Sequence, residues 1–269
     1  MTLSVVNEGM ATTLVGVDPS TPVLQPAFPW IVFDMDGTLV DTLGLNLDAL
    51  NYAVEGFLKR TLSIDEASAI PSGTLGEQMA NFIPVSAIPQ ATERFLAYYT
   101  SHFGSGTRFF PGLRGLLFTL QARGVELAVC TGAGRSIADY TLERFGLSQF
   151  FRTIVTVDDV SEPKPDPEGL RIVMETIGAD CNHTVYIGDH PDDIEASRKA
   201  GVKSAGALWG SMYRHELHSP KPDFLFKHPS GALTLSDYCI TQTRVRTAHE
   251  TLSQIPQAFL KRASPSKKC

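Results

Sequence analysis

Residues 30–41 read WIVFDMDGTLVD: four consecutive apolar residues are followed at once by two aspartates, Asp34 and Asp36. A short apolar run without polar alternation is typical of a strand buried on both faces of a parallel sheet. Two carboxylates at this spacing can reach one cavity if the backbone turns after them, and Gly37 permits such a turn. On its own, the pattern also fits an ordinary acidic turn, because Asp and Gly are common turn residues.

Apolar runs and helical segments alternate along the rest of the chain. The apolar runs cover 126–130, 153–157 and 184–187, with a weaker one at 202–208. Segments with helical spacing lie at 112–123, 134–145, 167–177 and 191–200, and each is followed by a glycine. This alternation predicts an α/β fold with a Rossmann-like parallel sheet and helices on both of its faces.

Residues 43–108 interrupt the alternation. Apolar residues recur there every three or four positions, and Met79, Phe82 and Ile83 mark one of several helices. We therefore expect a helical cap of 43–108, a Rossmann-like core of 30–42 and 109–236, and extensions at 1–29 and 237–269. The first extension lacks a helical period and is expected to be flexible or loosely docked, whereas 235–262 is expected to be partly helical.

The composition excludes several classes of protein. The chain has 269 residues, of which 43% are hydrophobic and 19% charged, close to the average of globular proteins. No apolar run approaches the ~20 residues of a membrane helix, and the N-terminus lacks the pattern of a signal peptide. We expect a cytoplasmic protein with no membrane partner. The four cysteines show no zinc-site spacing, so free thiols are expected.

The net charge of −6 is distributed unevenly. Residues 241–269 contain six basic residues and one acidic residue, so the preceding part of the chain is more acidic than the total. An acidic surface repels the phosphates of nucleic acid at long range, and we expect no nucleic-acid partner. An anionic substrate would need a local cluster of positive charge.

Polar residues also follow the other predicted strands. Thr131 and Gly132 come after the second strand, where a hydroxyl and free backbone amides before a helix suit a phosphate group. Lys164 stands between two prolines after the third strand, and Asp189 and Asp193 follow the fourth. Each motif alone also fits a plain cap, a solvated lysine or negative residues at a helix start. Ligand sites of such sheets lie at the carboxyl ends of the strands, so we expect one shared site.

This order of motifs resembles the haloacid dehalogenase superfamily of phosphotransfer enzymes. The matching strings are FDMDGTLVD at 33–41, VCTG at 129–132, KPDP at 164–167 and IGDHPDDI at 187–194, and the resemblance covers residues 30–210. The inserted helices resemble the small cap of the subclass that contains phosphoglycolate phosphatases, pyrophosphatases and β-phosphoglucomutases.

The resemblance implies different roles for the two aspartates. Asp34 is expected to be the nucleophile that forms an aspartyl-phosphate, and Asp36 the general acid and then the general base. Dehalogenase members lack the second acid, and phosphonate-cleaving members carry Ala in its place. An aspartate at position 36 therefore argues against both of those chemistries.

The remaining site residues are expected to bind a metal ion and the phosphate group. The resemblance implies Mg²⁺ as the cofactor, with Asp34, the backbone carbonyl of Asp36, and Asp189 as ligands, and with Asp193 binding directly or through a water. Mg²⁺ prefers such oxygen donors. Thr131, Gly132 and Lys164 are expected to bind the phosphate group, and Thr131 and Lys164 also to act in catalysis.

The implied function is Mg²⁺-dependent hydrolysis of a small phosphate monoester, as in phosphoglycolate phosphatases, with a small phosphorylated metabolite as the partner. The alternatives are phosphoryl transfer as in β-phosphoglucomutase, pyrophosphate hydrolysis, and, from another class, a non-catalytic phosphate-binding regulatory protein. We expect a monomer or a homodimer. Arg135 is expected to reach a second anionic group of the substrate or to be solvated, and 73–77 resembles a substrate-facing cap loop.

Overall fold

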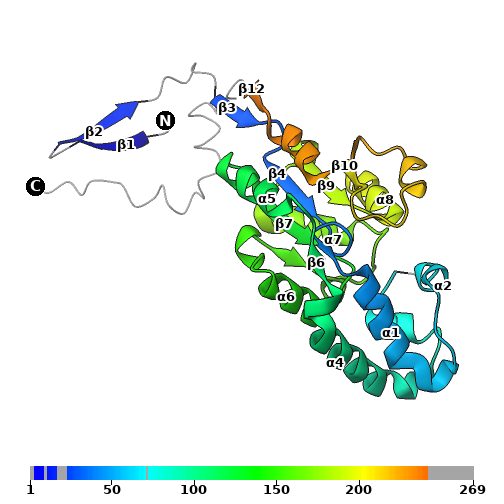
Figure 1. Ribbon diagram of the computed structural model, residues 1–269. Helices are drawn as coiled ribbons and strands as arrows, with labels where there is room; N and C mark the ends of the chain where they lie inside the picture. The colour runs from blue at the N-terminus through cyan, green and yellow to red at the C-terminus, as the bar shows by residue number, and fades with distance from the viewer. Residues whose placement is uncertain (1–2, 9–10, 17–22, 71, 242–269) are drawn as a thin grey trace, which may run out of the picture. The chain divides into compact units, whose positions relative to one another are not determined.

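A computed structural model describes residues 3–8, 11–16, 23–70 and 72–241 (Figure 1). The chain divides into one unit of Met1–Gln25 with Tyr238–Cys269 and a larger unit of Pro26–Asp237. None of the helices in the described part of the chain is long and apolar enough to cross a membrane. Cys130 is buried, and both it and Cys181 are free thiols.

The smaller unit contains short strands rich in residues that favour extended backbone. Strands β1 (Leu3–Glu8) and β2 (Ala11–Gly16) pair antiparallel, and β3 (Val23–Pro26) pairs with β12 (Tyr238–Thr241). Strands β1, β2 and β3 all lie within 1–29, the segment for which the sequence predicts a flexible or loosely docked extension. Within the segment expected to be partly helical, 235–262, the described residues end a 3-10 segment at Ser236 and form a strand at Tyr238–Thr241. Residues 242–262 lie outside the described residues.

The larger unit is built on a six-stranded parallel sheet, as the sequence predicts. Its order is β11 (Phe224–Phe226), β10 (Lys203–Ala207), β9 (Thr184–Gly188), β4 (Trp30–Phe33), β7 (Glu126–Cys130) and β8 (Ile154–Val155). Phe33 at the end of central strand β4 pairs in register with Val129 of β7 and Ile187 of β9. The residues that follow these three strands therefore meet at one edge of the sheet.

Helices cover both faces of this sheet, because its central strands are apolar on both sides. Helices α5 (Leu113–Ala122) and α6 (Arg135–Arg144) contribute to the core on the face of Ile31 and Phe33. Helices α7 (Glu168–Ile177) and α8 (Pro191–Ala200) contribute to the core on the face of Val32. Successive side chains of β4 therefore pack in the cores on opposite faces of the sheet.

Two short strands connect the helical cap to the core. Strands β5 (Val40–Asp41) and β6 (Arg108–Phe109) pair antiparallel, and the cap helices lie between them in the sequence. These helices are α1 (Leu43–Leu58), α2 (Ile64–Ser68), α3 (Leu75–Met79) and α4 (Ile88–Gly106). Helices α1 and α4 pack side by side (Figure 1).

Local sequence signals explain where the structure departs from the predicted elements. Helix α3 ends at Met79, so Phe82 and Ile83 are not helical, and Pro84 disfavours helix at the residue before it. Strand β8 is shorter than the predicted 153–157, because Thr156 and Asp159 form a capping box that begins a 3-10 turn. Strand β11 is not predicted. The 3-10 segments are Val85–Ala87, Ser148–Phe150, Val157–Asp159, Cys181–His183, Glu216–His218 and Pro229–Ser236.

Candidate active site

Lys164 connects two carboxylates at the carboxyl edge of the sheet. Its Nζ donates to Oδ1 of Asp34, which follows β4, over 2.9 Å, and to Oδ1 of Asp193, in the first turn of α8, over 2.7 Å. Burial opposes charge on Lys164, but the carboxylates of Asp193 and Asp34 hold its pKa well above the ordinary value. The loop after β8 therefore delivers a fixed positive charge to the end of β4.

Tyr186 completes this arrangement and is not predicted from the sequence. Its hydroxyl donates to the carbonyl oxygen of Cys130 over 2.7 Å and accepts from Lys164 Nζ over 3.2 Å. It also lies 3.0 Å from Oδ1 of Asp193. A buried tyrosine hydroxyl in an apolar strand needs a hydrogen-bond partner. The position of Tyr186 within the apolar run 184–188 is therefore the sequence feature that could have indicated its role.

Asp34, Asp189 and Asp193 form an acidic cluster in which one carboxylate oxygen of each lies within 4.8 Å of the others. All three are buried. The pKa of Asp34 is raised to about 7, chiefly because burial penalises its charged form, while Lys164 opposes part of the rise. Burial, and then the charge of Asp34, raise the pKa of Asp189 well above its ordinary value. An oxygen-only donor set with excess negative charge fits a divalent cation.

The turn after Asp36 brings its loop against the acidic cluster. Gly37 has a φ of +73°, and a Cβ built on it would lie 2.3 Å from Oδ2 of Asp189. Thr38 Oγ1 donates to Oδ1 of the same aspartate over 3.0 Å. A side chain at position 37 would be strained and would displace Asp189, so this close approach requires glycine.

Two residues at the start of the cap hold Asp36. The Thr42 hydroxyl donates to Oδ1 of Asp36, and Asn46 Nδ2 donates to the same oxygen over 3.1 Å. Burial raises the pKa of Asp36, although both hydrogen bonds act in the opposite direction. Neither Thr42 nor Asn46 is predicted as a site residue from the sequence, where they form an i, i+4 pair of polar residues at the start of α1.

Thr131 and Gly132 lie where the sequence places them, at the end of β7. Both line the same cavity as Asp34, Asp36 and Lys164. Oγ1 of Thr131 accepts a hydrogen bond from the backbone amide of Ala133 over 3.1 Å, which fixes the turn before α6.

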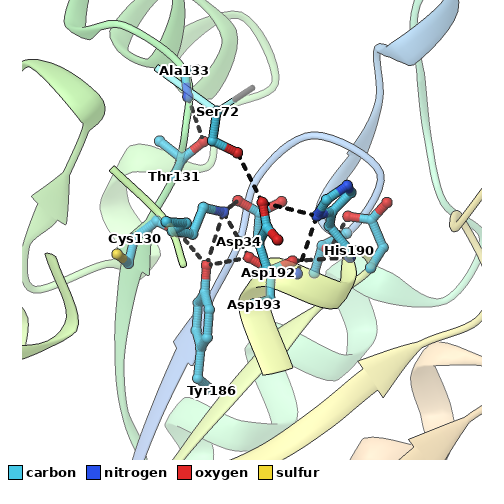
Figure 2. Close-up of polar contacts among 12 residues, drawn as sticks. Asp34, Ser72, Cys130, Thr131, Ala133, Tyr186, His190, Asp192 and Asp193 are labelled. Carbon is cyan, nitrogen blue, oxygen red and sulfur yellow. Dashed lines mark hydrogen bonds and ion pairs between the residues drawn. The ribbon is translucent and has the colours of Figure 1, made fainter. Parts of the chain in front are cut away.

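The cavity has a volume of about 300 Å³ and lies between the core and the cap. Ser72 of the cap donates to Oδ2 of Asp192 in α8 over 2.9 Å (Figure 2). In the cap loop 73–77, Leu75 lines the cavity, whereas Thr74 and Glu77 form a capping box at the start of α3. This loop therefore faces the site through an apolar side chain.

Arg135 does not line the cavity; its side chain is 38% exposed and is paired within the protein. Its guanidinium donates to Oδ2 of Asp159 and to the carbonyl oxygen of Ile154, the latter over 3.0 Å, and a weaker ion pair joins it to Asp139 at 3.4 Å. Arg135 thus ties α6 to the segment after β8. Its charge is neutralised there and does not enter the cavity.

Comparison with known proteins gives consistent similarities. A model of the haloacid dehalogenase-like hydrolase family matches residues 31–207. Phosphoglycolate phosphatase from Agrobacterium fabrum is 30% identical over 69% of this chain and 83% of its own length. Pyrophosphatase PpaX from Bacillus pumilus is 30% identical over 76% of this chain and 94% of its own.

A solved structure shows the same fold. The crystal structure of a predicted phosphoglycolate phosphatase from Haemophilus somnus matches with a TM-score of 0.70 at 24% identity. The match covers 78% of this chain and 98% of that protein.

Proposed function

The chain belongs to the haloacid dehalogenase-like hydrolase family, and we propose that it is a Mg²⁺-dependent phosphatase that hydrolyses a small phosphate monoester through an aspartyl-phosphate on Asp34. The observation that carries this proposal is the meeting of Asp34, Asp36, Thr131 and Lys164 at one cavity. The reaction class is the one that the name of a similar protein, phosphoglycolate phosphatase from Agrobacterium fabrum, indicates for that relative.

In the first step, a carboxylate oxygen of Asp34 attacks the phosphorus atom and the bond from phosphorus to the leaving oxygen breaks. Asp36 donates its proton to that oxygen. Burial raises the pKa of Asp36, which favours the protonated form that the donation requires. Thr42 and Asn46 hold one oxygen of Asp36 and so orient the carboxyl group that carries the proton.

In the second step, water attacks the phosphorus atom of the aspartyl-phosphate. Asp36, now ionised, takes a proton from the water, and the bond between phosphorus and the Asp34 oxygen breaks. Inorganic phosphate leaves and the Asp34 carboxylate is restored. Lys164 stays within hydrogen-bond distance of Asp34 and offsets negative charge in both steps.

The residues that would hold Mg²⁺ are Asp34, the backbone carbonyl of Asp36, and Asp189. When bound, the ion supplies positive charge that stabilises the phosphoryl oxygens. Both oxygens of Asp193 already accept hydrogen bonds, from Lys164 on Oδ1 and from the His190 amide on Oδ2. This favours a contact from Asp193 through a water, with positioning of Lys164 as its direct role.

The test is turnover of p-nitrophenyl phosphate by the full chain with Mg²⁺ and with excess chelator. We expect turnover only with Mg²⁺, and loss of it to background in Asp34→Asn. Asp139→Asn, on an exposed aspartate of α6, is the matched control and should turn over at the normal rate. Equal turnover by Asp34→Asn and the native protein would overturn the nucleophile assignment.

Pyrophosphate hydrolysis is the second candidate, because the chain is as similar to pyrophosphatase PpaX as to a phosphoglycolate phosphatase. Phosphate release from pyrophosphate and from phosphoglycolate, measured as kcat/KM with Mg²⁺, separates the two. We expect weak turnover of both, because each carries a second anionic group, and a strong preference for pyrophosphate would replace the monoester proposal.

A further inference from the structure

The wall that the cap contributes to the cavity is apolar. Eight of its eleven residues have apolar side chains, and these include Leu43, Leu47 and Leu50 of α1, Leu75 of α3 and Phe95 of α4. The core wall carries the charged residues of the cavity, which include the acidic cluster, Asp36 and Lys164. A substrate held between the walls therefore has one end in a charged environment and the other end against hydrocarbon.

The three polar residues of the cap wall carry no charge, and each donates a hydrogen bond within the protein. Asn46 donates to Asp36, Ser72 to Asp192, and Gln78 Nε2 to the carbonyl oxygen of Gly73 over 3.0 Å. The Ser72 contact joins cap and core in this arrangement, so the cap wall is already in place over the site.

The Lys and Arg residues of the cap lie outside the cavity lining. Arg60 pairs with Glu66 at 2.7 Å, Arg94 with Glu55 at 2.9 Å, and Arg108 with Asp41 at 2.6 Å. Lys59 follows the end of α1, nine residues beyond Leu50, or about 14 Å along the helix axis. None of these four lines the cavity in the described part of the chain.

The positive charge on the core wall lies beside the nucleophile, where the phosphate group would react. Among the described residues that line the cavity, Lys164 is the one Lys or Arg, and it is bound to Asp34 and Asp193. Nδ1 of His190 accepts a hydrogen bond from the Asp192 amide over 3.1 Å, so this nitrogen already has a partner within the protein. A second anionic group on the substrate would thus lie against the apolar cap wall without a Lys or Arg to neutralise it, at a considerable cost in free energy.

We propose that the substrate is a phosphate monoester of a small uncharged alcohol that carries an apolar group, and that a carboxylate or second phosphate on the leaving group is rejected. This rests on the proposed function, because it concerns the leaving group of the same reaction. The apolar end packs against Leu47, Leu50 and Phe95, and the phosphoryl end meets Asp34 and Lys164.

Isobutyl phosphate and phosphoglycolate test this directly, because two methyl groups in the first replace the two carboxylate oxygens of the second. We expect kcat/KM with Mg²⁺ to be at least tenfold higher for isobutyl phosphate. A difference below tenfold, or a preference for phosphoglycolate, overturns the inference while the phosphatase proposal stands. Absence of Mg²⁺-dependent turnover on both esters and on p-nitrophenyl phosphate overturns the two together.

A charge placed on the cap wall gives an independent readout. Leu47→Arg should raise kcat/KM for phosphoglycolate relative to isobutyl phosphate by tenfold or more, because it supplies the missing partner. Val85→Arg adds the same charge at a cap position that is 75% exposed and outside the cavity, and should leave the ratio unchanged. Circular dichroism checks that both variants fold, and an equal shift in the two variants counts against the inference.

Discussion

Ser72 and Asp192 are 120 residues apart in the sequence, yet the hydroxyl of the first donates to Oδ2 of the second over 2.9 Å. Asp192 stands in the first turn of α8, beside the acidic cluster, so the cap contacts the core at the edge of the candidate site. The cap is joined to the core through the two-residue strands β5 and β6. We expect it to open and close about the hinge segments 41–45 and 106–112, as lids over active sites do.

Removal of the Ser72 hydroxyl should weaken the closed arrangement. A hydrogen bond of this kind contributes about 0.5–1.5 kcal/mol, so Ser72→Ala should raise KM by about two- to tenfold and change kcat less. Steady-state kinetics on p-nitrophenyl phosphate measure this. Ser101→Ala is the control, because it removes a cap hydroxyl whose contacts, with the Tyr98 carbonyl and with Nδ1 of His102, lie within α4. Equal kinetics in the two variants would show that the contact with Asp192 does not hold the cap.

Asp36→Asn should separate substrates by their leaving groups. An alkyl phosphate needs protonation of the leaving oxygen, whereas p-nitrophenol leaves as its anion. The variant should therefore lose up to about 10²–10⁴-fold more of its phosphorylation rate on the alkyl ester. Because no base then activates water, aspartyl-phosphate should accumulate with p-nitrophenyl phosphate. Rapid quench and mass spectrometry measure both effects, and equal loss on both esters with no trapped adduct would contradict the role of Asp36.

The affinity of the protein for Mg²⁺ should decrease as the pH is lowered below about 7. The pKa of Asp34 in the metal-free protein is raised to about 7, chiefly by burial, so the carboxyl is ionised above that pH and protonated below it. A cation must displace this proton, and affinity should drop roughly tenfold per pH unit on the acidic side. Calorimetric titration of Mg²⁺ at pH 6 and pH 8 measures the difference. Identical affinities would mean that Asp34 does not ligate the ion.

Calcium should inhibit the Mg²⁺-dependent reaction. Ca²⁺ accepts more ligands at longer distances than Mg²⁺, so Asp34 can bind it through both oxygens and lose its line of attack. Added Ca²⁺ should lower turnover at fixed Mg²⁺, and excess Mg²⁺ should restore it. Turnover supported by Ca²⁺ alone would contradict this geometry.

Tyr186→Phe should reduce activity and stability together. The change leaves the Cys130 carbonyl without its hydrogen bond and removes one contact of Lys164. A buried acceptor left unpaired costs about 1–3 kcal/mol of the free energy of unfolding, measured by urea denaturation. Lys164 would be held less firmly, so kcat should also fall. Tyr140→Phe, which removes a hydrogen bond to the Thr100 carbonyl away from the site, should leave kcat unchanged.

The sequence alone determined the arrangement of the reacting groups. Apolar runs separated by helical segments dictate parallel strands, and parallel strands bring their carboxyl ends to one edge. For that reason Asp34, Thr131 and Asp189 could be assigned to one site from local pattern. Gly37 belongs here too, because a turn with positive φ after two aspartates has a strong sequence signature.

Only the tertiary structure decided the partners of these groups. Tyr186, Asn46 and Ser72 act through side chains whose partners lie elsewhere in the chain or on another element, and periodicity carries no information on such contacts. Arg135 pairs with Asp159 for the same reason. The apolar cap wall is also a tertiary result: a leucine at helical spacing has the same local pattern whether it packs in a core or faces a cavity. Which of the two it does depends on how the cap helices lie over the sheet.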